Sequence, residues 1–223
     1  MKNYTDLNII VDRSGSMGSI ASDMEGGIGT FLETERKTGD RTVVSYFTFD
    51  DQYEAVFTDK EITDEIGIII QPRGLTALWD AVGKTIAAVG EKLAKMNEDD
   101  RPNRVLFMII TDGQENCSKE YTKDAVKAMI KTQRETYAWD FAFLGTTEDI
   151  MMQGSDIGIA KGSGLQYEAT QAGILRSFAT VSNSYQSYKH LDRSNLSTRC
   201  QTINFADALE PTSKVEPQDT VTS

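Results

Sequence analysis

Short runs of apolar residues alternate along this chain with longer stretches in which apolar residues recur every three or four positions. The short runs predict buried β-strands, and the longer stretches predict amphipathic helices. The strongest strand signal covers residues 104–111, where Val105 begins six consecutive apolar residues. A strand that is apolar on both faces is typical of the centre of a parallel sheet with helices on each side. The pattern therefore predicts an α/β fold.

The expected strands and helices follow one another in alternation. Strands are predicted at residues 7–11, 42–49, 53–57, 104–111, 139–144 and 157–160. Helices are predicted at residues 20–37, 76–96, 118–135, 148–153 and 165–191. Because the turn-like pair Asp50 and Asp51 follows the second strand, the second and third strands are expected to form a hairpin. We therefore expect a Rossmann-like, doubly wound fold, with a mostly parallel central sheet, one antiparallel edge strand and helices on both faces.

The periodic pattern fades toward the C-terminus. A length of 223 residues suggests one domain. From residue 192 onward, Ser, Thr, Pro and charged residues replace the helical spacing. We therefore predict one domain over residues 1–191 and a C-terminal tail, residues 192–223, with little structure of its own. Within that tail, Ile203, Phe205 and Leu209 are the side chains able to dock onto the domain.

Composition excludes several classes of function. The single histidine, His190, excludes a zinc site with two histidine ligands and argues against a histidine-dependent catalytic triad. A formal charge of −11, from 23 basic and 34 acidic residues, argues against sequence-independent binding to nucleic acid. Cys117 and Cys200 lack the spacing of a metal site, and they form either one disulfide bridge or two free thiols.

Targeting signals are absent from the pattern. The N-terminus has no apolar run of signal-peptide length before its first acidic residue, Asp6. No stretch approaches the roughly 20 apolar residues that a membrane span needs. We therefore expect a cytoplasmic protein without a membrane partner.

Small oxygen-bearing side chains gather where the predicted strands end. Two carboxylates and three hydroxyls fall in loops expected at one edge of the sheet: Asp12, Ser14, Ser16, Thr76 and Asp112. With neither nitrogen nor sulfur among them, these donors suit a hard cation. The sequence predicts Mg²⁺, with Mn²⁺ and Ca²⁺ as alternatives. An ion held by only two carboxylates would be able to bind a further, external carboxylate.

These residues resemble the metal-ion-dependent adhesion site (MIDAS) of the von Willebrand factor A (vWA) domain family. Asp12, Ser14 and Ser16 match the family's D-x-S-x-S motif, Thr76 matches its loop threonine, and Asp112 matches its second aspartate. The order of strands and helices matches over most of the chain. The resemblance implies a non-enzymatic protein-binding module, in which the Glu or Asp of a partner protein completes the coordination of a magnesium ion.

The resemblance also implies a setting. Intracellular bacterial members of the family resemble adaptors for ATPase machines or stress-response complexes. The expected partner is therefore a protein of such a complex in a bacterial or phage context.

Other interpretations of the same residues stay open. Residues 12–16 could serve as a turn and helix cap, because Asp and Ser favour both. The chain could instead be a scaffold subunit that assembles through its helical faces and tail, with a vestigial metal site. A phosphotransferase of the haloacid-dehalogenase type would use Asp12 as its nucleophile, although Ser14 replaces the second carboxylate that such an enzyme needs. An EF-hand is excluded, because Met17 and Asp23 stand where it needs Gly and Glu.

Three charged residues flank the predicted metal loops. Arg13 and Arg73 either pair with a partner's carboxylate or are solvated. Glu115 either modifies the field of the metal site or caps the helix predicted at residues 118–135.

Overall fold

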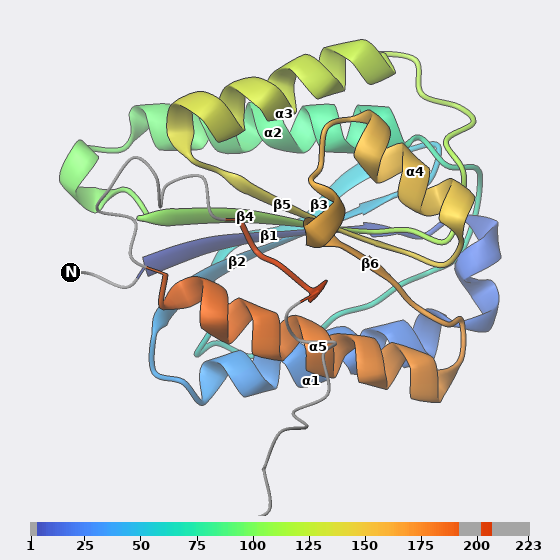
Figure 1. Cartoon of the computed structure of the whole chain (residues 1–223), viewed down its shortest axis with the longest axis horizontal. Helices are drawn as coiled ribbons and strands as arrows, with labels where there is room; N and C mark the ends of the chain where they lie inside the picture. Colours follow the sequence, from blue (N-terminus) through green and yellow to red (C-terminus); the bar gives the residue numbers. More distant parts are fainter. Residues whose placement is uncertain (1–3, 192–201, 207–223) are drawn as a thin grey trace, which may run out of the picture.

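A single six-stranded sheet forms the centre of the molecule (Figure 1). The computed structural model describes residues 4–191 and 202–206. Within them the strand order is β3-β2-β1-β4-β5-β6, and every neighbouring pair is parallel except the antiparallel hairpin of β2 and β3. The strands are β1 (Tyr4–Asp12), β2 (Arg41–Phe49), β3 (Tyr53–Glu61), β4 (Arg104–Ile110), β5 (Asp140–Gly145) and β6 (Gly164–Gln166). This is the mostly parallel sheet with one antiparallel edge strand that the sequence predicts.

Helices cover both faces of the sheet. The helices are α1 (Ala21–Arg36), α2 (Leu78–Lys95), α3 (Lys123–Tyr137), α4 (Glu148–Asp156) and α5 (Gln171–Lys189). Figure 1 shows α1 and α5 on one face, and α2, α3 and α4 on the other. The predicted doubly wound fold is therefore confirmed.

The two central strands explain why the apolar runs are unbroken. Every residue of β1 and β4 is buried. Because successive side chains of a strand point to opposite faces, Ile9 packs into the core under α1 and α5, and Ile10 packs into the core under α2 and α3. Each face of these strands meets a helical layer, so apolar residues are favoured on both faces, although β1 also buries Thr5, Asp6 and Asn8.

Two helix predictions are corrected by contacts that are distant in sequence. The helix predicted at residues 118–135 begins at Lys123 instead. The buried Asp80 carboxylate accepts hydrogen bonds from the backbone N–H groups of Lys119, Glu120 and Tyr121, which holds this segment as a loop. The helix predicted at residues 165–191 begins at Gln171, because residues 164–166 pair with β5 as the sixth strand.

The strand predicted at residues 157–160 is wrong. Ile157 and Ile159 are apolar because both are buried in the core beneath α3 and α4. Their backbone N–H groups donate to carbonyl groups of α4, at Gln153 and Gly154, instead of to a neighbouring strand.

Part of the predicted tail packs against the domain. Ile203 and Phe205 are buried, as expected for docking residues. The Ser163 hydroxyl donates to the carbonyl of Ile203, and the N–H of Phe205 donates to the carbonyl of Gly162. Leu209, with residues 192–201 and 207–223, lies outside the described residues. Across the part of the chain that the structure describes, none of the helices is both long enough and apolar enough to span a membrane.

Candidate metal centre

The five predicted ligands lie on three loops at one edge of the sheet. Asp12 is the last residue of β1, and Ser14 and Ser16 follow it directly. Asp112 follows β4, the parallel neighbour of β1. Thr76 lies two residues before the start of α2. Because β1 and β4 run parallel side by side, their carboxyl ends deliver these side chains to the same place.

A chain of hydrogen bonds connects four of these side chains. The Ser14 and Ser16 hydroxyl oxygens are 3.1 Å apart, and Ser16 Oγ donates to Asp112 Oδ1 at 2.6 Å. Asp12 Oδ1 accepts from the backbone N–H of Ser14 at 2.6 Å. Asp12 Oδ2 accepts from the hydroxyl of Thr111 at 2.6 Å. These bonds fix the orientation of both carboxylates.

Gly113 marks the point on which the ligand oxygens converge. A β-carbon built on Gly113 would lie 2.8 Å from Thr76 Oγ1, 3.3 Å from Asp12 Oδ2 and 3.5 Å from Ser14 Oγ. Gly113 is not among the described glycines with positive φ, so its backbone does not need glycine. The absence of a side chain at Gly113 instead leaves a small space that is bordered by these three oxygens. Ser16 and Asp112 are linked to this group by the hydrogen bonds from Ser14 to Ser16 and from Ser16 to Asp112.

Burial makes this space favourable for a cation. Asp12 is fully buried, and burial raises the pKa of its carboxyl to about 6, although hydrogen bonds from Thr111 and Ser14 oppose that rise. Burial also raises the pKa of Asp112, opposed by the hydrogen bond from Ser16. A buried carboxylate without a full counter-charge is costly, and a bound cation would offset that cost.

The donor chemistry fits a hard divalent ion. In residues 4–191 and 202–206, no group of three His, Cys, Asp or Glu side chains is arranged to hold a metal. The candidate set instead joins two carboxylates to three hydroxyls. Such oxygen donors suit Mg²⁺ or Mn²⁺, which retain some water ligands, and they suit soft metals poorly. These residues therefore fit the cation that the sequence predicts.

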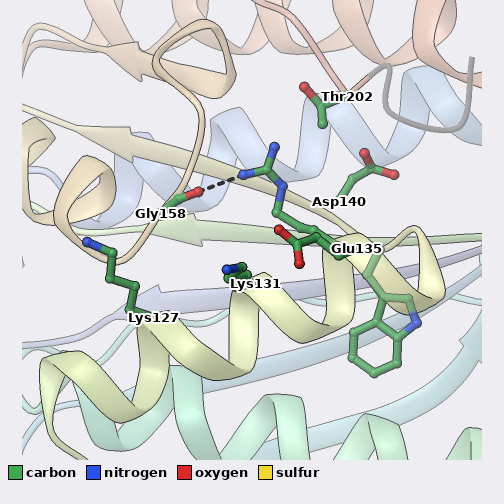
Figure 2. Close-up of a pocket in the computed structure, with 8 residues that line it drawn as sticks. Lys127, Lys131, Glu135, Asp140, Gly158 and Thr202 are labelled. Carbon is green, nitrogen blue, oxygen red and sulfur yellow. Dashed lines mark hydrogen bonds between the residues drawn. The ribbon is translucent and has the colours of Figure 1, made fainter. Parts of the chain in front are cut away.

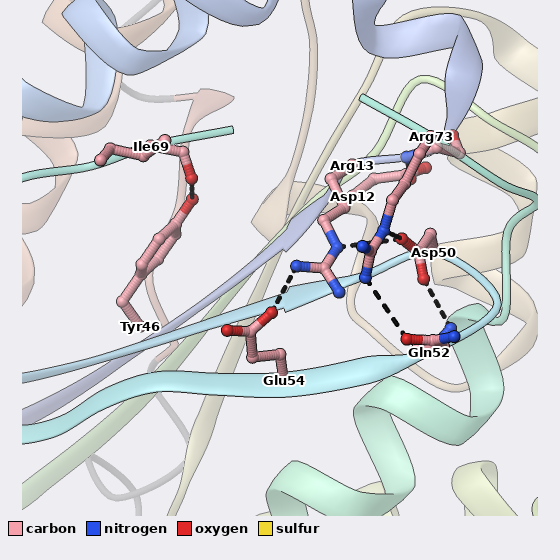
Figure 3. A network of polar contacts seen from close by, with 9 residues as sticks. Asp12, Arg13, Tyr46, Asp50, Gln52, Glu54, Ile69 and Arg73 are labelled. Carbon is pink, nitrogen blue, oxygen red and sulfur yellow. Dashed lines mark hydrogen bonds and ion pairs between the residues drawn. The ribbon is translucent and has the colours of Figure 1, made fainter. Parts of the chain in front are cut away.

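Asp50 joins two of the ligand loops (Figure 3). Its buried carboxylate accepts hydrogen bonds from Arg13 Nε at 3.0 Å and from Arg73 Nε at 2.6 Å. The backbone N–H of Arg73 also donates to the carbonyl of Arg13 at 2.8 Å. Burial raises the pKa of Asp50, but hydrogen bonds from Arg73 and the Gln52 N–H, together with the charge of Arg13, outweigh it, so the pKa lies below its ordinary value.

Both arginines are therefore paired inside the protein. Arg13 also donates to Glu54 at 2.6 Å, and Arg73 donates to Gln52 at 3.4 Å. The Arg13 side chain is buried, whereas the Arg73 side chain is 54% exposed and so remains solvated as well as paired. They act as a clamp that holds loop 12–16 against loop 73–76 through Asp50, a residue that the sequence marked only as part of a turn.

Two further residues position the loops: Asn116, which the sequence did not single out, and Glu115, which it did. The Thr76 backbone is held by Asn116, whose side chain accepts from Thr76 N–H and whose N–H donates to the Thr76 carbonyl, both at 3.0 Å. Glu115 accepts from the N–H groups of Trp79, Cys117 and Ser118, so it organises this loop and does not cap α3. Cys117 is a free thiol.

The same contacts argue against Asp12 as a nucleophile. Each of its oxygens already accepts a short hydrogen bond, from Ser14 N–H and from the Thr111 hydroxyl. Its side chain has no exposed surface. A phosphoryl group would therefore have to move the residues that cover Asp12 before it could reach the carboxylate.

Comparison with solved structures identifies the architecture. The vWF domain of the type V pilus tip protein Mfa5 from Porphyromonas gingivalis is 7% identical, with a TM-score of 0.58 over 86% of this chain and 98% of that chain. The pilus adhesin SpaC from Lactobacillus rhamnosus GG, in an open conformation, is 13% identical, with a TM-score of 0.62 over 80% of this chain and 29% of that one.

A third similar structure has a metal at its own MIDAS motif. Proximal thread matrix protein 1 from the mussel byssus, with a zinc-occupied MIDAS motif, is 13% identical, with a TM-score of 0.54 over 80% of this chain and 45% of that chain. The present chain thus spans less than half of the length of the byssus protein and of SpaC. No family model matches the sequence, and no curated protein matches it. The structural likeness nevertheless establishes that this chain has the fold of a von Willebrand factor A domain.

Proposed function

We propose that this chain is a protein-binding module that depends on a divalent cation, and that an acidic side chain of a partner protein completes the cation's coordination. The observation that carries the proposal is the convergence of Thr76, Asp12 and Ser14 oxygens on the space beside Gly113. Asp112 and Ser16 supply the remaining donors at the side of this space. We propose Mg²⁺ as the ion, with Mn²⁺ and Ca²⁺ as alternatives.

The burial of the ligands indicates the direction from which a partner would approach. Asp12, Ser14 and Thr76 are buried, whereas Ser16 is exposed and Asp112 is half-buried. A cation held in this way would be enclosed by protein on one side and would face solvent on the other. Its solvent-facing coordination positions would hold water, which a carboxylate can replace. The adhesins among the structural neighbours, and the byssus protein with zinc at its MIDAS, support this use of the site.

The cellular setting is part of the proposal. We expect a cytoplasmic protein that binds a component of a bacterial or phage ATPase or stress-response complex. The pilus adhesins among the structural neighbours make an extracellular setting the alternative. The charge of −11 favours a protein partner over nucleic acid.

The proposal is tested by capturing partners on immobilised protein with and without the metal. Wild-type protein, Asp12→Ala and a control, Asp99→Ala, are each incubated with bacterial lysate in Mg²⁺ and in EDTA. Asp99→Ala removes the same charge from an exposed residue of a short 3-10 helix before β4, at the opposite end of that strand from the ligand loops.

We expect a partner that is retained by wild type and by Asp99→Ala in Mg²⁺, and that is lost in EDTA and with Asp12→Ala. A partner that is retained equally in Mg²⁺ and in EDTA, and equally by wild type and Asp12→Ala, would contradict the proposal. It would favour a scaffold with a vestigial metal site.

A further inference from the structure

A second cavity lies apart from the metal centre, at the start of β5 (Figure 2). Its volume is about 330 Å³, within the range of small-molecule sites. It is enclosed by α3, by the beginning of β5, by the turn after α4 and by the docked segment 202–206. The lining residues are Lys127, Lys131, Arg134, Glu135, Trp139, Asp140, Gly158 and Thr202.

The cavity is far from the metal along the same sheet. Trp139 and Asp140 stand at the amino end of β5, whereas the candidate metal ligands stand at the carboxyl ends of β1 and β4. Because β5 is six residues long and parallel to β4, the two places are separated by roughly 20 Å of strand.

Three cationic side chains of α3 face this cavity. Lys127, Lys131 and Arg134 follow one another at spacings of four and three residues, which places them on one face of the helix. They span about 10 Å along the helix axis. The net charge of the chain is −11, so these three neighbouring cations make the local charge of this helix face opposite in sign to the charge of the whole chain.

The pairing of these cations differs from that of their neighbour. Lys123, one turn earlier on α3, forms an ion pair with Asp156 at 3.0 Å. Within the described part of the chain, neither Lys127 nor Lys131 has an ion pair. Like charges spaced by four residues weaken a helix by a few tenths of a kcal/mol. Glu135, four residues after Lys131, offsets part of this repulsion, and a bound anion would offset the rest.

Arg134 is held in place with donors to spare. Its Nη1 donates to the carbonyl of Gly158 at 2.7 Å, which ties the side chain to the turn after α4. A guanidinium carries five N–H donors in one plane, so this contact leaves several for a ligand. The remaining donors suit a phosphate group, whose oxygens match the guanidinium geometry.

The carboxylates in the lining do not cancel this charge. Asp140 is buried and accepts a hydrogen bond from the Tyr188 hydroxyl of α5 at 2.6 Å, so its carboxylate is engaged on the opposite face of the sheet. Glu135 is exposed, and it lies on α3 beyond the row of cations. The lining therefore carries three positive and two negative charges, a net charge of +1.

An apolar wall accompanies the charges. Trp139 is 6% exposed and stacks on Phe107, with ring centroids 5.4 Å apart, so its ring is a rigid part of the wall. The cavity lining thus combines an aromatic surface with cationic groups, the combination expected for a ligand with an apolar body and an anionic end.

We propose that this cavity binds a small organic phosphate with at least two negative charges. The phosphate groups would lie along Lys127, Lys131 and Arg134, and the organic body would lie against Trp139. This inference does not depend on the metal centre.

The test is an NMR titration of full-length ¹⁵N-labelled protein in metal-free buffer with three probes. Pyrophosphate supplies the phosphates alone, ADP adds an aromatic body, and citrate replaces phosphate by carboxylate. The chain has two tryptophans, and Trp79→Phe assigns their indole N–H signals. Because Trp79 lies on α2 near the metal loops, it serves as an internal reference.

We expect ADP to shift the Trp139 indole signal and not that of Trp79, to bind more tightly than pyrophosphate, and to bind at least tenfold more tightly than citrate. The double variant Lys127→Gln/Lys131→Gln should weaken ADP binding at least tenfold. The control Lys37→Gln/Lys119→Gln, which removes the same charge from exposed lysines elsewhere, should change it less than twofold.

Three results would overturn the proposal. The first is the absence of any Trp139 shift at 10 mM of every probe. The second is equal loss of binding in the two double variants, which would indicate general electrostatics. The third is equal affinity for citrate and ADP, which would reject phosphate as the ligand class.

Discussion

Gly113→Ala tests whether the space beside Gly113 is the cation site. The added β-carbon would lie 2.8 Å from Thr76 Oγ1 and 3.3 Å from Asp12 Oδ2. A Mg²⁺ ion takes its oxygen ligands at 2.0–2.1 Å. If the ion occupies the space beside Gly113, the methyl group would displace it without changing any charge.

The expected loss of affinity is large. Replacing a residue that merely supports a metal ligand costs 10–100-fold in affinity. Because the methyl group occupies the site itself, we expect more than about 100-fold, which corresponds to roughly 3 kcal/mol. The crowding should also lower the free energy of unfolding by about 1–3 kcal/mol. Titration calorimetry with Mg²⁺ measures the affinity, and urea unfolding measures the stability.

Gly26→Ala is the matched control. Gly26 is exposed on α1, and a β-carbon there would meet nothing within 4 Å. The change should leave Mg²⁺ affinity within twofold and stabilise the fold by about 0.5–1 kcal/mol, because alanine favours helix. Wild-type affinity in a folded Gly113→Ala protein would refute the reasoning.

Three further predictions concern the clamp, the helix packing and pH. Asp50→Asn should weaken Mg²⁺ binding about 10–100-fold in calorimetry, although Asp50 is not a ligand, because the two ligand loops lose their shared anchor. Gly27→Ala should lower the urea-unfolding free energy by about 1–3 kcal/mol, since a methyl group there would overlap the Phe178 ring; an unchanged value would contradict this packing. Burial raises the pKa of Asp6 in the folded state, so its contribution to stability falls as pH rises from 3.8 through that raised value. Asp6→Asn should remove this pH-dependent contribution to stability. The free energy of unfolding of the wild type minus that of the variant should therefore decline as pH rises from 3.8 through the raised pKa of Asp6.

The sequence predicts elements whose burial is dictated by local pattern. The central strand β4 is recognisable because both faces are covered, which favours the unbroken apolar run at residues 105–110. The five candidate ligands are recognisable because parallel strands bring their carboxyl ends together, so that residues distant in sequence meet at one edge.

What the sequence misses depends on contacts between distant residues. The start of α3 is set by Asp80, about 40 residues earlier, whose carboxylate holds the preceding loop. The pairing of Arg13 and Arg73 through Asp50 follows from a hairpin turn that lies beside both loops. The role of Gly113 is a matter of space, and a glycine after a strand signals only a turn until its neighbours are known.

The most direct test of the central claim is ¹³C electron–nuclear double resonance on the wild-type protein loaded with Mn²⁺ and ¹³C-carboxylate acetate. The account predicts that each chain binds one Mn²⁺ ion and that Mg²⁺ displaces it. The ¹³C carboxylate carbon of acetate should show the hyperfine coupling to Mn²⁺ that is expected for direct coordination. This coupling should disappear in Asp12→Ala. A chain that binds no Mn²⁺, or one whose bound Mn²⁺ never takes up acetate, would contradict it.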